Sequence, residues 1–204
     1  MRITSPLYWS GGIYRTVMRL LYGAQFDERY AVVSRLIPDG ARVVELCCGC
    51  GYLYENFLRR RRIDYLGIDL LPQMIRRLQR LGARVEAANV ASAEVPPADF
   101  VLMLGSLYHF HPNEACILRK MAQSGTGIVL EPVANLSQST NPMIRLLART
   151  MSSIPGTNSA YRLTAERFET VLKDAGVEVV SSERVLNAKY ALTIFRSASE
   201  AGAR

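Results

Sequence analysis

The sequence predicts an α/β fold, a mostly parallel sheet with helices on both faces, and two observations support this prediction. First, short β-branched apolar runs alternate with amphipathic segments of helical length from Ala41 onward. This alternation is typical of parallel strands joined by right-handed helical crossovers. Second, the apolar run from Val43 to Leu46 leads into Gly49 and Gly51, followed by an amphipathic segment. A glycine turn between a strand and a helix lets the backbone approach a ligand at the helix N-terminus.

The length of 204 residues suits one domain, 1–204, with a sizeable core. Apolar residues make up 49% of the chain, yet no apolar run is long enough to span a bilayer. The first ten residues lack the basic region and the apolar region that mark a signal peptide. We therefore expect a cytoplasmic protein with no transmembrane segment.

The N-terminal segment, residues 1–35, is expected to form two helices. The first carries apolar residues at helical spacing: Trp9, Ile13, Val17, Leu20 and Leu21. The second is predicted over 26–36 and ends at the turn Pro38-Asp39-Gly40. This segment either packs on the edge of the core or forms a cap over the ligand side of the sheet.

The strands and helices after the N-terminal segment are predicted from the same patterns. Five strands are expected over 42–47, 64–69, 83–88, 99–104 and 126–131. The helices between them are expected over 52–62, 72–82, 90–95 and 112–123. The third of these segments is short and has a weak helical pattern. A clean amphipathic helix over 164–175 then precedes two closing strands, 177–182 and 190–195.

The segment 134–161 interrupts this alternation of strands and helices, and it is too long for an ordinary connection. It contains an apolar and basic stretch from Met143 to Met151. Because the insertion follows the fifth strand, we expect it near the ligand side of the sheet. It is either one more surface helix or a second capping element that faces the N-terminal one.

The ends of the first two strands carry residues suited to a nucleotide-like ligand. The second strand ends in Asp69, about 20 residues after the glycine loop, where a mononucleotide-binding unit places the acid that binds ribose hydroxyls. A dinucleotide fold needs a third glycine three residues after Gly51, and Tyr54 occupies that position. A nicotinamide cofactor is therefore the least favoured ligand.

The pattern Glu45-x-x-x-Gly49-x-Gly51 resembles motif I of the class I S-adenosylmethionine-dependent methyltransferases. The resemblance covers roughly 37–196 and is strongest over 43–110. It implies S-adenosylmethionine as cofactor and S-adenosylhomocysteine as product. It also implies a doubly wound, seven-stranded sheet that ends in a hairpin, with an antiparallel final strand.

The same resemblance gives roles to residues at the first two strand ends. Gly49 and Gly51 would face the methionine half of the cofactor. Glu45 would orient its ammonium group directly or through water, the alternative being a buried acid held by backbone amides. Asp69 would accept hydrogen bonds from both ribose hydroxyls, and Leu70, with its neighbour Leu71, would pack on the adenine.

The next two strand ends complete the implied cofactor site. The family usually places an acid after the third strand, where this chain has Asn89 and Val90. The amide oxygen of Asn89 is still able to accept a hydrogen bond from the adenine amino group. After the fourth strand, backbone carbonyls near Gly105 would hold the methionyl ammonium.

Tyr108 and His109 are the candidate catalytic residues. The methyl group of S-adenosylmethionine is already activated, so the enzyme has to align the nucleophile and exclude water. A base helps only an acceptor that begins protonated, and His109 suits this role by its position after the fourth strand and because histidine side chains exchange protons near neutral pH. Alternatively, His109 is structural at a helix start, and Tyr108 binds substrate or packs. His111, beside a turn proline, ranks lower.

The net charge of +7 suggests anionic partners only weakly. Just three of the 25 basic residues are lysines, and genome base composition explains such a preference for arginine as readily as phosphate recognition does. Arginines in 59–62 and at 76, 77, 80 and 84 are expected on solvated surface, with nucleic acid or acidic lipid as the alternative. The four cysteines, 47, 48, 50 and 116, lack the spacing of a zinc site, and the three in the glycine loop are expected as reduced thiols that pack around the turn. We expect no metal.

These observations predict methyl transfer to oxygen or nitrogen of a small-molecule or lipid-like acceptor. Apolar capping segments favour an acceptor with a substantial apolar part, and flanking arginines would suit an acidic group on it: Arg15, Arg19, Arg145 and Arg149. Two alternatives remain open, an RNA methyltransferase that uses the arginine faces and a non-catalytic protein that binds S-adenosylmethionine.

Overall fold

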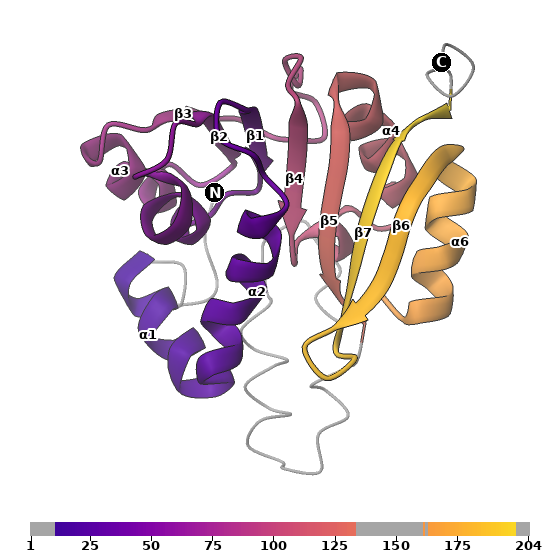
Figure 1. Ribbon diagram of the computed structural model, residues 1–204, viewed down its shortest axis with the longest axis horizontal. Helices are drawn as coiled ribbons and strands as arrows, with labels where there is room; N and C mark the ends of the chain where they lie inside the picture. Colours follow the sequence, from indigo (N-terminus) through magenta and orange to yellow (C-terminus); the bar gives the residue numbers. More distant parts are fainter. Residues whose placement is uncertain (1–10, 134–160, 162, 199–204) are drawn as a thin grey trace.

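The computed structural model describes residues 11–133, 161 and 163–198. A seven-stranded sheet with the strand order β3-β2-β1-β4-β5-β7-β6 forms its centre (Figure 1). β7 runs antiparallel to both neighbours, β5 and β6, and the other neighbouring strands are parallel. The predicted fold class, a doubly wound, mostly parallel seven-stranded sheet with an antiparallel final strand, is confirmed.

All seven strands lie within three residues of their predicted bounds. Central strands β4 (Phe100–Leu104) and β5 (Thr126–Pro132) are mostly buried, as expected for apolar runs covered on both faces. The remaining strands are β1 (Arg42–Leu46), β2 (Asp64–Asp69), β3 (Arg84–Ala87), β6 (Val177–Val185) and β7 (Tyr190–Ser197).

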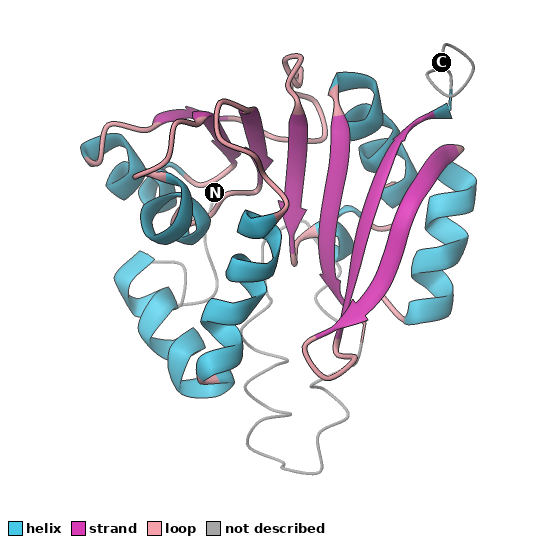
Figure 2. Cartoon of the chain, in the orientation of Figure 1, coloured by secondary structure: helices cyan, strands magenta, loops and turns pink. Residues whose placement is uncertain are grey.

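Helices cover both faces of the sheet (Figure 2). One face packs against α4 (Glu114–Ser124) and α6 (Ala165–Ala175). The other packs against α2 (Ala24–Arg35), η2 (Tyr54–Leu58) and α3 (Pro72–Arg80), and α1 (Gly11–Tyr22) contacts α2 and α3 from outside. Every helix in the described part of the chain is too short or too polar to span a bilayer.

The helix predicted over 52–62 forms over a shorter stretch, 52–58, and most of it is the π-helix η2. The amide of Arg59 donates to the carbonyl oxygen of Tyr54 at 2.8 Å, one residue further back than in an α-helix. Tyr54 packs on the ring of Tyr65 with 4.6 Å between centroids, and Leu58 is fully buried. A 3.6-residue period also places positions 54 and 58 on one face, so the sequence pattern does not distinguish this π-helix from an α-helix.

The helix predicted over 90–95 does not form. The side-chain oxygen of Asn89 accepts a hydrogen bond from the amide of Ala91 at 3.0 Å, and two prolines follow at positions 96 and 97. An asparagine that bonds to the following backbone in this way competes with helix formation. The connection is therefore an irregular loop.

The apolar stripe expected in the first helix is only partly matched. Val17 is half-buried and Met18 is buried, whereas Leu20 is 81% exposed. Packing on the edge of the core therefore explains only one side of α1. Trp9 and residues 134–160, including the segment expected as a second cap, lie outside the described residues.

Candidate functional site

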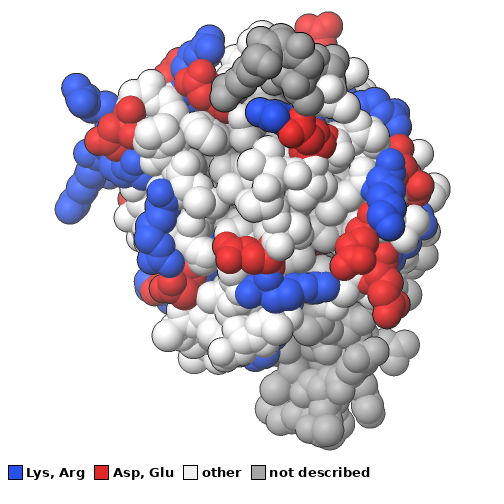
Figure 3. Space-filling model, turned by 45° about the vertical axis from the view of Figure 1, so that its right-hand side comes forward, with Lys and Arg blue, Asp and Glu red and all other residues white. Residues whose placement is uncertain are grey.

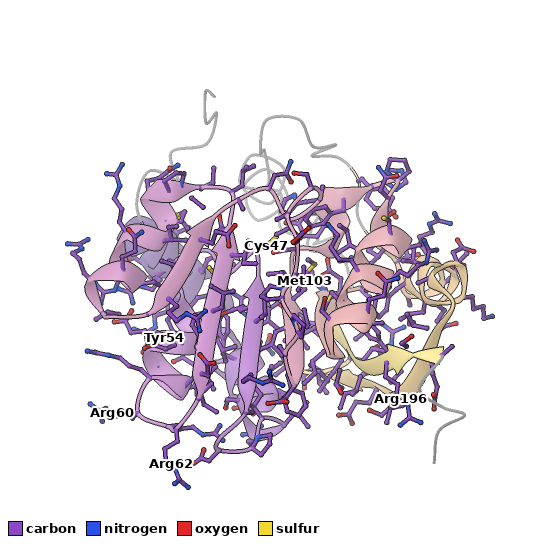
Figure 4. All side chains as sticks on the ribbon, turned by 90° about the horizontal axis from the view of Figure 1, so that it is seen from above. Cys47, Tyr54, Arg60, Arg62, Met103 and Arg196 are labelled. Carbon is purple, nitrogen blue, oxygen red and sulfur yellow. The ribbon has the colours of Figure 1, made fainter. Side chains whose placement is uncertain are left out.

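The carboxyl ends of β1, β2, β4 and β5 lie along one edge of the sheet, where β1 pairs with both β2 and β4. The strand order reverses at this point, and ligands of open α/β sheets bind at such a switch. Figure 4 shows Cys47, just after β1, beside Met103 of β4. Most predicted site residues stand in the loops that leave this edge.

Asp69 joins the first two of these loops. Its Oδ2 accepts a hydrogen bond from the amide of Gly49 at 2.8 Å, and its Oδ1 accepts one from the amide of Leu71 at 2.9 Å. Burial raises the pKa of Asp69, and the two amide donors partly offset that effect. Each carboxylate oxygen has a further lone pair, so both remain available to ligand hydroxyls.

The glycine loop has a left-handed backbone at Cys47, Gly49 and Gly51, with φ angles of 56°, 54° and 69°. A Cβ added to Gly49 would meet nothing within 4 Å, so this residue leaves open space beside the backbone. A Cβ on Gly51 would lie 2.1 Å from Cδ2 of Leu78, which is fully buried. Gly51 therefore lets α3 pack against the loop.

Glu45 is buried below this loop and accepts a hydrogen bond from the hydroxyl of Tyr65 at 2.5 Å. A tyrosine hydroxyl thus holds this acid, in place of the backbone amides considered from the sequence. Burial raises the pKa of Glu45 to about 8, against the lowering effect of Tyr65. The carboxyl group is therefore largely protonated near neutral pH, and its charge is a weaker anchor for an ammonium than the sequence suggests.

The loop after β3 contains the predicted adenine contacts. Asn89 is exposed and Val90 is buried, and Leu70, at the end of β2, is 39% exposed. Leu71 is buried. Three carbonyl oxygens of this loop accept hydrogen bonds from Nζ of Lys120 in α4, a residue that the sequence analysis did not single out.

The turn after β4 begins at Gly105, which has a φ angle of 63°, and continues into the 3₁₀ helix η3 (Leu107–Phe110). The side chains of Tyr108 and His109 are half-buried there, with their ring centroids 4.0 Å apart. The turn therefore carries both predicted catalytic residues together with Gly105.

Glu131 near the end of β5 holds this turn. It is fully buried, and its carboxylate accepts hydrogen bonds from the amides of Leu107 at 3.2 Å and Tyr108 at 3.4 Å. Burial raises the pKa of Glu131 to about 8, against the lowering effect of these donors. Sequence reasoning missed this residue, although an acid inside the apolar run 128–133 is a visible signal of a buried, partnered carboxyl group.

A second buried acid lies at the far end of the same turn. Glu114 is fully buried at the start of α4, and its Oε1 lies 2.9 Å from Nδ1 of His111. The ring of Tyr161 stacks on His111 with 3.7 Å between centroids. His111, ranked lower from the sequence, is thus oriented by a carboxylate, an arrangement that either anchors the helix or supports a base.

Two arginines expected to bind an acidic acceptor group are engaged within the protein. Arg15 pairs with Glu55 at 2.7 Å, and Glu55 also pairs with Arg77 of α3. Arg19 pairs with Asp27 at 3.5 Å and donates to the hydroxyl of Tyr52 at 2.8 Å. These contacts fasten α1 to the body of the protein. Arg145 and Arg149 lie outside the described residues.

The arginine run 59–62 lies away from this site. Figure 4 shows Arg60 and Arg62 pointing outward at the margin opposite Cys47. Arg61 instead donates to the carbonyl oxygen of Ser34 at 2.9 Å and pairs with Asp39. On the face shown in Figure 3, basic and acidic side chains alternate around a broad uncharged area.

The cysteines of the described residues are free thiols, buried at Cys48 and Cys50, half-buried at Cys47 and exposed at Cys116. Within the ranges that the structure describes, no three metal-binding side chains come together. A groove between α2 and the β6–β7 hairpin is lined by none of the predicted site residues; its apolar lining is Val32, Leu36, Val185, Leu186 and Leu192.

The residues at the strand ends fit an elongated ligand with a nucleoside at one end. A buried carboxylate with free lone pairs, Asp69, suits ribose hydroxyls. The open backbone at Gly49 leaves space for the central part of such a ligand, and the loop at Asn89 offers polar groups to a base. The turn with Tyr108 and His109 lies past the end of neighbouring β4, as a site for a reacting group would.

Comparison with known proteins points to one family. A family model described as a methyltransferase domain matches residues 21–182. Trans-aconitate 2-methyltransferase from Methylobacterium nodulans is 30% identical over 114 residues, which cover 53% of this chain and 44% of that protein. The chain thus matches less than half the length of this curated relative.

Solved structures with the same fold cover most of the chain. The structure of a Haloferax volcanii complex between the Trm112 methyltransferase activator and a putative methyltransferase matches with a TM-score of 0.72 and 14% identity, covering 97% of this chain and 99% of that one. Magnesium protoporphyrin IX methyltransferase from Synechocystis, with bound S-adenosylhomocysteine, matches with a TM-score of 0.61 and 17% identity, covering 88% and 85%.

Proposed function

The chain belongs to the methyltransferase domain family and uses S-adenosylmethionine as its methyl donor, and from this premise we propose that it methylates an oxygen or nitrogen atom of a small-molecule or lipid-like acceptor. The observation that carries the proposal is the placement of Tyr108 and His109 on a turn beside the Asp69 edge of the sheet. This turn is half-buried and presents aromatic surface, which suits an acceptor with an apolar part.

We assign the cofactor-binding residues as follows. Asp69 binds the ribose hydroxyls, Asn89 and Val90 bind the adenine edge, and Leu70 packs on the adenine ring. The backbone of Gly49 and Gly105 lines the methionine portion, while Gly51 supports the loop by allowing α3 to approach. Glu45 orients the ammonium group of the cofactor from below the loop, where Tyr65 fixes the glutamate side chain.

The bound cofactor supplies a methyl group on a positively charged sulfur, so the protein has to align the acceptor and keep water away. His109 removes the proton from a hydroxyl or amine acceptor, and Tyr108 positions that acceptor. Because Arg15 and Arg19 are already paired with Glu55 and Asp27, they are poor candidates for binding an acidic group on the acceptor.

A carboxylate acceptor is a distinct case, because the relative from Methylobacterium nodulans is named for trans-aconitate. A carboxylate oxygen is already deprotonated near neutral pH and needs no base. Acceptors with hydroxyl, amine and carboxylate groups therefore make different demands on His109. Substitution of that residue separates these classes.

Calorimetry with S-adenosylhomocysteine, followed by an acceptor screen, tests the proposal. Wild-type protein and an Asp64→Ala variant should bind, whereas Asp69→Ala should not. Asp64 is a suitable control because it stands at the opposite end of β2 and pairs with Arg84 at the surface. Turnover on apolar hydroxy, amino or carboxylic acids supports the proposal, and methylation of RNA alone contradicts it.

The two alternatives make separate predictions. An RNA methyltransferase that uses Arg59, Arg60 and Arg62 would lose affinity steeply as salt rises. That hypothesis is less favoured, because Arg60 and Arg62 lie at the margin opposite Cys47, away from the edge of the sheet where the cofactor would bind. A non-catalytic protein would bind S-adenosylmethionine and transfer its methyl group to none of the acceptors.

A further inference from the structure

The loop between β3 and β4 has no regular structure, yet α4 holds it at several points. The ammonium group of Lys120 donates to the carbonyl oxygens of Val90 at 3.0 Å, Ala91 at 3.0 Å and Ala93 at 2.9 Å. One turn further along α4, the hydroxyl of Ser124 donates to the carbonyl oxygen of Val95 at 2.9 Å.

The hydrogen-bond donors of Lys120 match the carbonyl oxygens of this loop in number and in distance. An ammonium group has three donors, and here each has one carbonyl oxygen within hydrogen-bond distance. The side chain is half-buried, and no ion pair is recorded for it in the described part of the chain. Its charge is therefore stabilised by backbone dipoles of this single loop.

The loop that Lys120 holds is the one that carries Asn89 and Val90. The carbonyl oxygen of Asn89 accepts hydrogen bonds from the amides of Ser92 at 3.0 Å and Ala93 at 2.7 Å, and its side-chain oxygen accepts one from Ala91 at 3.0 Å. Backbone contacts to Asn89 and the side-chain contacts of Lys120 therefore hold the same loop. The positions of the Asn89 amide group and the Val90 backbone depend on both sets of contacts.

We propose that Lys120 is a positioning residue for the adenine end of the cofactor, since its three hydrogen bonds to the 90–93 loop fix the groups that recognise the adenine edge. This inference rests on the proposed function, because it assumes that S-adenosylmethionine binds at the Asp69 edge. Lys120 acts through the loop and does not touch the cofactor. Its removal should weaken cofactor binding and leave the chemical step unaffected.

Arg119 offers a matched control. It precedes Lys120 in the same helix and also donates to backbone carbonyls, those of Asp174 at 3.1 Å and Ala175 at 3.3 Å. Those carbonyls belong to the end of α6. Arg119→Met therefore removes a cation and its carbonyl contacts from α4 without releasing the 90–93 loop.

The first measurement is amide hydrogen exchange in the absence of ligand. Lys120→Met should speed exchange in a peptide covering 88–95, and Arg119→Met should not. Lys120→Arg should restore part of the protection, because a guanidinium donates to carbonyls but in a planar fork. Unchanged exchange in Lys120→Met would overturn the inference, whether or not the protein binds a cofactor.

The second measurement compares S-adenosylhomocysteine with S-inosylhomocysteine, which has a carbonyl oxygen in place of the adenine amino group. Lys120→Met should weaken S-adenosylhomocysteine binding about tenfold and reduce the preference for adenine over hypoxanthine. With an active acceptor, KM for S-adenosylmethionine should rise about tenfold while kcat stays within about twofold.

The outcomes separate the two claims. If the wild type binds neither compound, the proposed function fails. If it binds S-adenosylhomocysteine and Lys120→Met retains the same affinity and preference, only the role of Lys120 fails. A fall in kcat with no rise in KM would also overturn the inference, because that pattern places Lys120 in the chemical step.

Discussion

Oδ2 of Asp69 lies 2.8 Å from the amide nitrogen of Gly49, so the end of β2 is joined directly to the loop after β1. The other oxygen of the same carboxylate binds the amide of Leu71, at the start of α3. One side chain therefore fixes the relative positions of two loops that would line the cofactor. This arrangement makes the acid important for both the shape and the chemistry of the site.

Asp69→Asn should abolish most cofactor binding while the protein remains folded. An asparagine places an NH₂ group against the amide of Gly49 or Leu71, because only one of its two polar atoms is an acceptor. Calorimetry should show S-adenosylhomocysteine affinity at least about 100-fold lower. Asp64→Asn, on the same strand, should bind like the wild type, and equal affinity in both variants would remove Asp69 from the site.

Substitutions in the glycine loop should change the free energy of unfolding in opposite directions, depending on the residue replaced. Cys47→Gly should leave stability unchanged or raise it, because a left-handed backbone costs a residue with a Cβ about 1–2 kcal/mol. Gly51→Ala should lower the free energy of unfolding by about 2–4 kcal/mol, since its new Cβ overlaps Leu78. A third variant, Gly49→Ala, should have a stability between those of the other two. Urea unfolding measures the free energy of unfolding of all three. A Cys47→Gly variant less stable than Gly49→Ala would contradict this account.

His109→Gln should reveal the class of acceptor. For a hydroxyl or amine acceptor, kcat/KM should fall about 10²–10⁴-fold, and the acidic limb of its pH profile should disappear. For a carboxylate acceptor, the loss should be small and the limb absent from the wild type as well. Affinity for S-adenosylhomocysteine should stay constant, and His111→Gln should leave the limb in place. Loss of the limb in His111→Gln alone would assign the base to the His111–Glu114 pair.

Glu131→Gln should slow methyl transfer without changing the acceptor preference. A glutamine has one acceptor oxygen for the amides of Leu107 and Tyr108, and its NH₂ group opposes one of them. The turn with His109 should therefore lose its fixed position, and kcat should fall about tenfold or more. Glu178→Gln is the control, because Glu178 lies on the edge strand β6 and pairs with Arg196 of β7. Equal kcat values in the two variants would show that Glu131 has only a structural role.

The stability of the protein should decrease between about pH 5 and pH 8. Burial raises the pKa of Glu45 from an ordinary value of 4.5, which applies to the unfolded chain, to about 8 in the folded protein. Between these values the folded state binds the proton more tightly, so the free energy of unfolding falls as pH rises and levels off above the folded pKa. The slope is at most about 1.4 kcal/mol per pH unit for one such carboxyl.

Glu45→Gln tests this dependence, because an amide oxygen also accepts a hydrogen bond from the hydroxyl of Tyr65. The variant should show a shallower slope, and the remainder should come from Glu131, whose pKa is raised in the same direction. Urea unfolding at several pH values provides the measurement. A slope identical to that of the wild type would show that Glu45 is charged in the folded protein.

The regular part of the fold was predictable from the sequence because its signals are local. The mostly apolar stretch 65–68 is bounded by Asp64 and Asp69, and it forms β2 with the predicted bounds. Thr164 and Gly176 frame α6 as a cap and a left-handed terminus. The position of Asp69 beside the glycine loop also followed, because parallel strands of one sheet end at the same edge.

The features that the sequence did not predict depend on contacts between distant residues. The π-helix η2 forms where Tyr54 packs against Tyr65 of another element. Lys120 and the loop it holds are about 27 to 30 residues apart in the chain, and no local pattern connects them. Glu131 carried a visible signal, an acid in an apolar strand, but its partners Leu107 and Tyr108 became evident only in three dimensions.

The placement of β7 between β5 and β6 has a consequence for synthesis of the chain. Among the described residues, β6 pairs only with β7, and β5 has β7 as its outer neighbour. While the ribosome is still adding residues before Tyr190, the nascent chain therefore exposes the apolar, hydrogen-bonding edge of β5. Strand edges of this kind attract other chains. The edge of β5 is therefore open to wrong pairing from the emergence of β5 until the arrival of β7.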